Sequence, residues 1–183
     1  MSARWQPFPR LRRGLRKLGL GESGSASVEF VLYVPLFLAV FMAAFESGLI
    51  TLRHVMLERA VDISVRNLRL GLWADPTPEM LRDEICAQSA IIPDCQNVLL
   101  LELIPVDQAT WTMPDPGASC VNRNEEIQPV TAFVTGGQNQ LMLVKACAIF
   151  NPIFPSTGLG LQLVRDDGGY AVTAFSAFVN EPV

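Results

Sequence analysis

The sequence has few of the residues on which most enzymes depend. It contains a single histidine in 183 residues, and Asp, Glu, Lys and Arg together make up only 17%. It holds no nucleophile elbow, zincin motif, phosphate-binding loop or dinucleotide-binding fingerprint. The spacings of its four cysteines fit no zinc or redox motif. These absences predict a non-enzymatic chain without a cofactor or a bound metal.

Two weaker candidate sites have simpler explanations. The one histidine, His54, follows an apolar run, where an exposed residue is more usual than a general base. Asp166 and Asp167 precede Gly168 and Gly169, a series too short for a calcium loop and typical of a tight turn.

The sequence also has one long hydrophobic run and no second run of that length. Residues 30–52 include a single charged residue, Glu46. As a helix this run would extend about 35 Å, enough to cross a hydrocarbon core of about 30 Å. A helix is required there because lipid cannot satisfy free backbone groups. The run therefore predicts a single membrane crossing, and it exceeds the 7–15 residues of a usual signal-peptide core.

The net charge of −4 hides an uneven distribution. Residues 1–24 carry six basic side chains and one acidic one, a net +5, which leaves −9 for the remainder. Because basic flanks stay in the cytoplasm, we expect the N-terminus there and the rest of the chain outside. An acidic body repels nucleic acid. The basic cluster lies directly before the apolar run, so an orientation signal is favoured over a nucleic-acid-binding arm.

The hydrophobic run continues into an amphipathic segment. Residues 52–70 contain neither Gly nor Pro, and Gly71 is a candidate C-cap. Asp62 and Arg66 lie four residues apart and are expected to pair. We expect one helix of about 45 residues over 25–71. One face of its amphipathic part is expected to comprise Leu57, Val61, Val65, Leu68 and Leu72.

The start of this helix carries a recognisable pattern. Residues 24–30 read Gly-Ser-Ala-Ser-Val-Glu-Phe, which resembles a prepilin peptidase site behind a basic leader. With further matches, the segment is similar to the TadE family, pilin-like minor proteins of tight-adherence (Flp) pilus assembly. The further matches are Pro35, Glu46-Ser47-Gly48, Arg53-His54 with Ala60, and Asn180-Glu181-Pro182.

The resemblance implies a function and a set of partners. A prepilin peptidase would cut after Gly24 and leave Ser25 as the new N-terminus. The chain would be a minor pilin-like subunit of the bacterial inner membrane with a periplasmic head. Its partners would be other pilin-like subunits and pilus assembly platform proteins of this secretion machine. Glu29, beside Phe30, would pair with the Ser25 amine of an adjacent chain and set the axial register.

A different interpretation of the same residues stays open. Gly24 and the serines can cap the helix, while Glu29 favours its positive N-terminal dipole. The chain would then be an uncleaved single-pass protein whose extracytoplasmic head is an adaptor or binding module.

Two residues inside the run have their own expectations. Glu46 follows Glu29 by seventeen residues, about 25 Å along a helix, so we expect it near the outer headgroups with access to water. Pro35 removes one helical hydrogen bond and predicts a local kink.

The remaining residues, 72–183, predict an α+β head with a small, mainly antiparallel sheet of three or four strands. Thr77-Pro78-Glu79 starts a helix that ends near Gln88. We expect strands at 97–106, 141–150 and 170–179, and loops at 113–117, 136–140 and 151–160.

The four cysteines all fall in this head. An even number in an oxidising compartment predicts two disulfides, and three connectivities are possible. We favour Cys86–Cys95 and Cys120–Cys147, each stabilising the head by roughly 2–4 kcal/mol.

The aromatic and apolar residues of the head suggest a core and one surface. Phe133, Phe150, Phe154 and Phe175 are expected in the core. The loop from Pro152-Ile153-Phe154-Pro155 to Leu159-Gly160-Leu161 is either a docking patch or is buried against the long helix.

Overall fold

The computed structural model describes residues 25–73, 75–110, 120–156, 158–163 and 169–181. The predicted leader 1–24 with its cut at Gly24, the loop 113–117, the turn at Asp166–Gly168 and Pro182 lie outside the described residues. The chain forms two units, residues 1–40 and 41–183.

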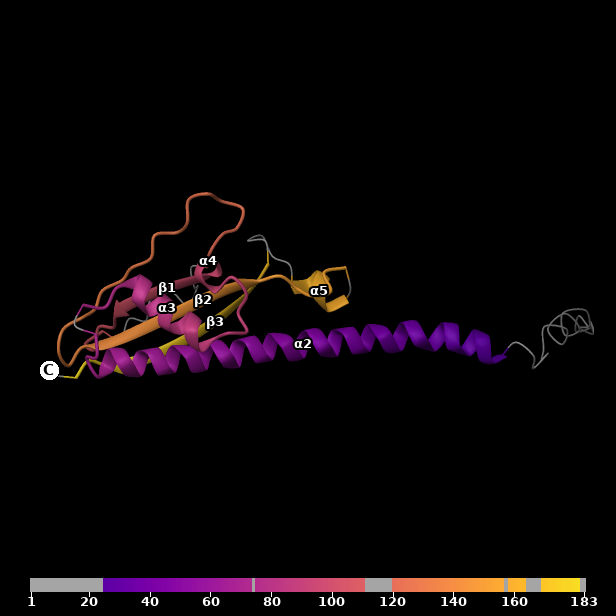
Figure 1. The fold of residues 1–183 in the computed structure, drawn as a ribbon, viewed down its shortest axis with the longest axis horizontal. Helices are drawn as coiled ribbons and strands as arrows, with labels where there is room; N and C mark the ends of the chain where they lie inside the picture. The colour runs from indigo at the N-terminus through magenta and orange to yellow at the C-terminus, as the bar shows by residue number, and fades with distance from the viewer. Residues whose placement is uncertain (1–24, 74, 111–119, 157, 164–168, 182–183) are drawn as a thin grey trace, which may run out of the picture. The chain divides into compact units, whose positions relative to one another are not determined.

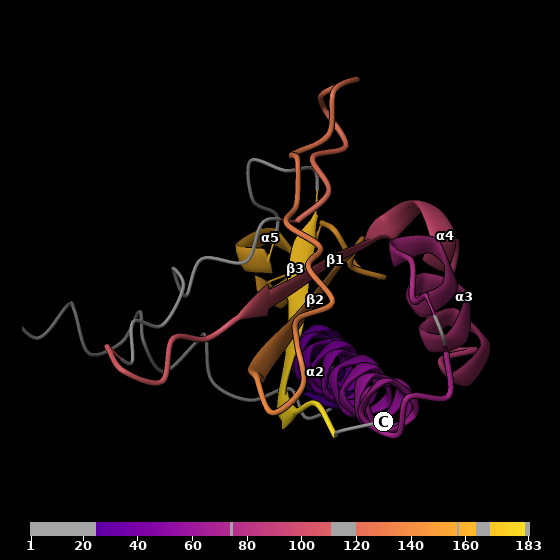
Figure 2. The same ribbon diagram turned by 90° about the vertical axis from the view of Figure 1, so that its left-hand side faces the viewer.

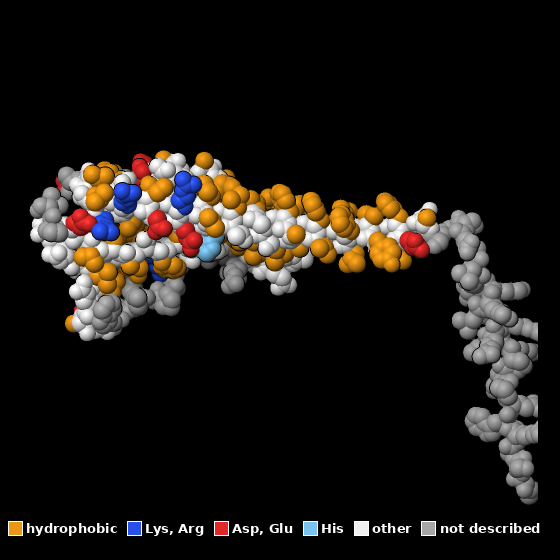
Figure 3. Space-filling model, turned by 90° about the horizontal axis from the view of Figure 1, so that it is seen from below, with side chains coloured by type: hydrophobic (Ala, Val, Ile, Leu, Met, Phe, Trp, Pro, Cys, Tyr) orange, Lys and Arg blue, Asp and Glu red, His pale blue; other side chains and the backbone are white. Residues whose placement is uncertain are grey.

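The predicted long helix is present as α2 (Ser25–Arg69), with Pro35 inside it. Its apolar side chains in the first unit are exposed, for example Phe30 at 66% and Leu36 at 63%. In Figure 3 hydrophobic side chains cover the exposed part of α2, while charged side chains gather over the head apart from one acid near the helix start. Among the described residues, one helix is long and apolar enough to cross a membrane.

Helix α2 ends in a Schellman motif. The Gly71 N–H donates to the Leu68 carbonyl at 3.0 Å and the Leu72 N–H to the Asn67 carbonyl at 3.2 Å. Gly71 has a φ of +62°, which glycine adopts without strain. The predicted C-cap is confirmed, but Leu72 lies past the end of the helix and is exposed, so its assignment to the apolar helix face was wrong.

The head contains a three-stranded antiparallel sheet in the order β1-β2-β3 (Figure 1). The strands are β1 (Leu99–Pro105), β2 (Leu141–Phe150) and β3 (Tyr170–Val179). The prediction is confirmed for β2 and β3 at both ends. Asn97 and Val98, predicted as strand, belong instead to the short helix α4 (Cys95–Val98), because Asp94 adopts a left-handed conformation that turns the chain there.

The core lies between α2, the helix α3 (Pro78–Gln88) and one face of the sheet (Figure 2). Thr77 caps α3 as predicted, because its hydroxyl accepts the Met80 N–H at 3.2 Å. The buried side chains from the two helices include Leu57 and Val61 of α2 with Leu81 and Ile85 of α3. They pack against sheet residues of one face: Leu99, Leu101, Leu103, Met142, Val144, Ala146, Ala148, Val172 and Ala174.

Both disulfides of the favoured pairing are present. Cys86–Cys95 joins α3 to α4, and Cys120–Cys147 joins Cys120 to β2. The α+β class with a small antiparallel sheet and two disulfides is therefore confirmed.

The opposite face of the sheet is less covered. Phe175 points to this face and is 49% exposed, so its assignment to the core was wrong, whereas Phe150 is buried. A buried ion pair lies on the same face, where Lys145 Nζ is 3.4 Å from the carboxylate of Glu102 on the neighbouring strand. Paired charges of this kind avoid the high cost of a lone buried ion.

Candidate functional site

The residues of the predicted processing site lie at the start of α2. Ser25 is the first residue of the helix, and Glu29 and Phe30 follow within its first two turns. The side chains of Glu29 and Phe30 are exposed in the isolated chain. This position is compatible with contact by another chain.

Glu46 makes the most unusual contact of the second unit. Its side chain is only 1% exposed, and its carboxylate accepts the Ile153 N–H at 2.9 Å and the Phe154 N–H at 3.0 Å. The expected water-accessible position is therefore wrong: the loop that follows β2 covers the carboxylate and supplies its partners. We call Glu46 with these two N–H groups the Glu46 clasp.

The loop held by the clasp is partly packed on α2 and partly exposed. Phe154 makes an edge-to-face contact with Phe45 of α2 at 6.2 Å between ring centres, while Ile153 is 45% exposed. The chain then forms α5 (Gly158–Leu163), which was not predicted because residues 151–160 are rich in Pro and Gly. Packing against the long helix is therefore found for Phe154, while the docking patch stays a prediction for the exposed residues.

Arg53 joins α2 to the start of β3. Its guanidinium donates to the Tyr170 hydroxyl and lies 4.6 Å from the ring centre of Phe150. Burial raises the pKa of Tyr170, and the hydrogen bond and charge of Arg53 offset only part of this rise. The neighbouring His54 is exposed and pairs with Glu58 at 3.2 Å, as expected of a surface residue.

Two further polar contacts join α2 to β3 and the residues after it. Ser176 Oγ donates to Asp62 Oδ1 at 3.1 Å, so the carboxylate expected to pair with Arg66 has a partner on the sheet instead. Arg69 pairs with Glu181 at 2.9 Å. Residues 46, 53, 62 and 69 of α2 contact residues 153, 170, 176 and 181 in turn. Both sets increase together along the chain, so α2 and β3 run in the same direction.

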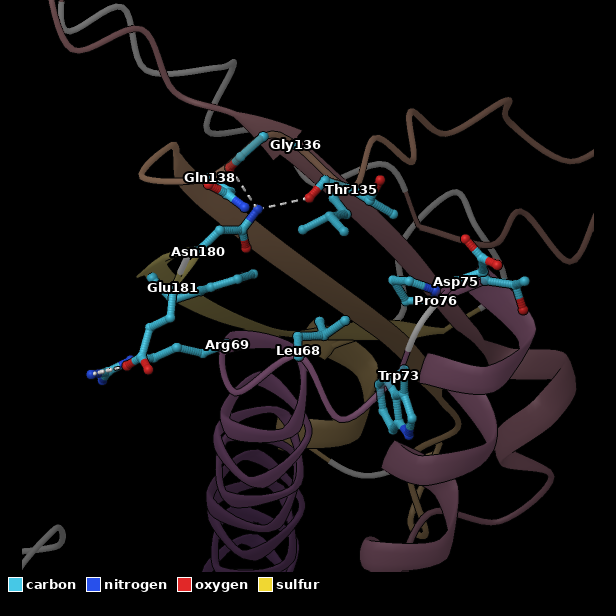
Figure 4. A pocket seen from close by; sticks show the side chains of 15 residues that line it. Leu68, Arg69, Trp73, Asp75, Pro76, Thr135, Gly136, Gln138, Asn180 and Glu181 are labelled. Carbon is cyan, nitrogen blue, oxygen red and sulfur yellow. Dashed lines mark hydrogen bonds and ion pairs between the residues drawn. The ribbon is translucent and has the colours of Figure 1, made fainter. Parts of the chain in front are cut away.

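One cleft among the described residues lies beside this last contact. It has a volume of about 470 Å³ and is bordered by the end of α2, the turn at 135–138 and Asn180 (Figure 4). The amide of Asn180 donates to the carbonyls of Thr135 and Gly137, and Glu181 pairs with Arg69. These polar side chains hold the C-terminal residues in place, which indicates a structural role for the cleft.

No cluster of three or more His, Cys, Asp or Glu residues able to hold a metal occurs in the described part of the chain. The Glu46 clasp and the contact of Arg53 with Tyr170 were not predicted from the sequence. In each contact the two residues lie far apart along the chain, by 107 residues for Glu46 with Ile153 and by 117 for Arg53 with Tyr170. The available signal was the position of Glu46 as the sole charge in a 23-residue apolar run, which requires a partner.

Comparison with known proteins identifies one family. The model of the family described as TadE-like protein matches residues 24–66, the segment that includes the cut motif and most of α2. The resemblance inferred from the sequence is confirmed over these residues. Neither curated proteins nor solved structures give a significant match.

Proposed function

We propose, from the premise that residues 24–66 are TadE-like, that this chain is a minor pilin-like subunit of a tight-adherence (Flp) pilus assembly and secretion machine. In this proposal a prepilin peptidase cuts after Gly24, and the mature chain acts structurally in pilus biogenesis. The observation that carries it is the coincidence of the cut motif, the family match and the apolar start of α2 in one segment.

The proposal includes an orientation in the bacterial inner membrane. The leader, with a net charge of +5, remains in the cytoplasm, and the head lies in the periplasm. Two disulfides support this side for the head, because disulfides persist in oxidising compartments and are rare in the cytoplasm.

Glu29 is the proposed assembly contact, together with Phe30. A carboxylate at the start of an apolar helix is stabilised in lipid by a nearby positive charge. The amine that cleavage would create at Ser25 of an adjacent chain supplies this charge. Prepilin peptidase, other pilin-like subunits and the assembly platform are therefore the proposed partners.

Co-expression with a prepilin peptidase tests the processing step. Cleavage should remove roughly 2.7 kDa, the mass of the leader, and Gly24→Arg should abolish this loss. Gly21→Arg adds the same charge within the leader and serves as the control that should still be cut. An unchanged mass in a host with active peptidase would favour the uncleaved protein with an adaptor head.

The assembly contact has a separate test. Glu29→Ala should leave the head folded, with both disulfides formed, but reduce co-purification with partner subunits and reduce piliation. Glu58→Ala changes an exposed acid farther along the same helix and is the matched control. Normal piliation by the Glu29 variant would contradict the proposed role in axial register.

A further inference from the structure

The loop held by the Glu46 clasp is unusually poor in free polar groups. Residues 151–163 contain no charged side chain. We call residues Pro152–Pro155 the tip of this loop. Its two prolines have no N–H, and the N–H groups of Ile153 and Phe154 both donate to Glu46. The four residues from Pro152 to Pro155 therefore present no unpaired backbone donor.

The carboxylate that satisfies these donors is itself hidden. Glu46 is 1% exposed, so the clasp exposes almost nothing of its charge. Backbone groups must be paired within the protein wherever water is excluded. The clasp supplies a hydrogen-bond acceptor for each N–H group of the tip. A surface loop in water does not need such an acceptor, because water accepts these hydrogen bonds.

The large exposed side chains of this segment are apolar, and its exposed polar side chains, Asn151, Ser156 and Gln162, carry no charge. Ile153 is 45% exposed and Leu161 of α5 is 61% exposed. Gly160 keeps α5 close to the tip, because a Cβ at this position would lie 2.0 Å from the Phe154 carbonyl oxygen. The tip and α5 thus form one compact, uncharged projection at the end of the head away from the C-terminus (Figure 1).

This projection is continuous with apolar surface of α2. Phe154 contacts Phe45, which is 52% exposed, and Phe41 one turn earlier is 58% exposed. Both belong to the hydrophobic run that is long enough to cross a membrane. The clasp therefore holds the projection against Phe45, a residue of this hydrophobic run.

We propose that the tip (Pro152–Pro155) and α5 insert into the interfacial region of the outer leaflet, as a second membrane contact beside α2. The occupant of the exposed apolar surface is lipid, because the surface continues that of the run and offers neither charge nor free donors in its tip for a polar partner. Interfacial segments of this kind bury apolar side chains at the boundary of headgroups and acyl chains. The inference rests on the proposed membrane anchoring, and it does not depend on cleavage after Gly24.

Depth-dependent quenching of a fluorescent label tests the inference. The full chain, with both disulfides formed, carries one added cysteine labelled with an environment-sensitive dye. It is reconstituted into vesicles of phosphatidylethanolamine and phosphatidylglycerol that contain a nitroxide lipid. Leu161→Cys reports on α5, Leu36→Cys on the apolar run, and Val130→Cys, at a position 99% exposed, on the head surface.

The inference predicts strong lipid quenching at residues 36 and 161 and little at residue 130. Quenching at 36 without quenching at 161 would overturn the second contact while leaving the membrane anchor in place. Absence of quenching at 36 would refute the anchor itself, and with it this inference. A label at 161 that is shielded only after a partner protein is added would show a protein-docking surface and likewise overturn it.

Discussion

Arg53 and Tyr170 lie 117 residues apart in the sequence, and a hydrogen bond from the guanidinium to the phenol oxygen joins them. The contact fixes the first residue of β3 to the middle of α2. Because Arg53 also lies over the ring of Phe150, one side chain connects the helix with two strands.

Replacing Arg53 should destabilise the head. Arg53→Ala removes a charged hydrogen bond and a cation–π contact, so we expect a loss of about 2–3 kcal/mol in the free energy of unfolding. Arg53→Lys should recover only part of this, because a lysine lacks the planar fork. Denaturant unfolding of the full chain in detergent measures the change. Arg59→Ala, an exposed position on the same helix, should change the free energy by less than about 0.5 kcal/mol.

The raised pKa of Tyr170 predicts that the head loses stability at alkaline pH. Its pKa is raised above the usual value of 10.0 by burial, so the folded state holds the proton more tightly than the unfolded state. The resulting stabilisation is complete below pH 10 and is lost as the pH rises through the folded-state pKa. The stability difference between the native chain and Tyr170→Phe should therefore shift against the native chain as the pH rises above 10. A difference that stays constant over this range would refute the assignment.

The Glu46 clasp should be needed to hold the loop against α2. Glu46→Ala leaves the N–H groups of Ile153 and Phe154 without their acceptor, and we expect a loss of about 1–3 kcal/mol. Glu46→Gln keeps one acceptor oxygen and should lose less. Hydrogen exchange at Ile153 and Phe154 should accelerate in the alanine variant, while exchange in β2 changes little. Unchanged protection at both amides would show that the clasp is not formed in solution.

The two disulfides should contribute unequally. Cys120–Cys147 closes a span of 27 residues and Cys86–Cys95 a span of 9. Chain-entropy arithmetic gives about 3.6 and about 2.6 kcal/mol respectively. Paired replacement by serine, one bridge at a time, followed by thermal unfolding, should lower the midpoint more for the 120–147 pair. The reverse order would show that strain or residual structure outweighs loop length.

Gly136 should tolerate no side chain. It has a φ of +69°, and an added Cβ would lie 2.4 Å from the Met142 sulfur. We expect Gly136→Ala to cost about 1–3 kcal/mol and to loosen the turn that Asn180 holds. At Gly137 the nearest atom would be 3.9 Å away, so Gly137→Ala should fold with nearly native stability. Equal effects of the two substitutions in thermal unfolding would contradict this account.

Local signals in the sequence were sufficient for most of the fold. The cap at Thr77, the glycine at position 71 and the apolar strands each act within a few residues of themselves, so their patterns predicted α3, the end of α2 and the strands β2 and β3. The short helix α4 was missed because the apolar residues that follow it match a strand. Its N-cap residue, Asp94, makes no side-chain capping hydrogen bond.

The contacts between α2 and the sheet could not be predicted in the same way. Asp62 was expected to pair with Arg66 because both lie on one helix face, but Ser176 on β3 competes for the same carboxylate. Glu46 was expected near water because the sequence does not reveal which distant loop returns to cover it. Such partners depend on how the chain folds back, which no local pattern encodes.

The parallel course of α2 and β3 has a mechanical consequence. Four polar contacts, at Glu46, Arg53, Asp62 and Arg69, join the helix to the last part of the chain in the same order along both. A force that pulls α2 along its axis while the head is held loads these contacts together in shear, rather than opening them one after another. Resistance to forced unfolding is governed by the rate of unfolding, and contacts that break together raise the barrier more than contacts that open one at a time. We therefore expect the head to stay folded and to move with its helix when the helix is pulled.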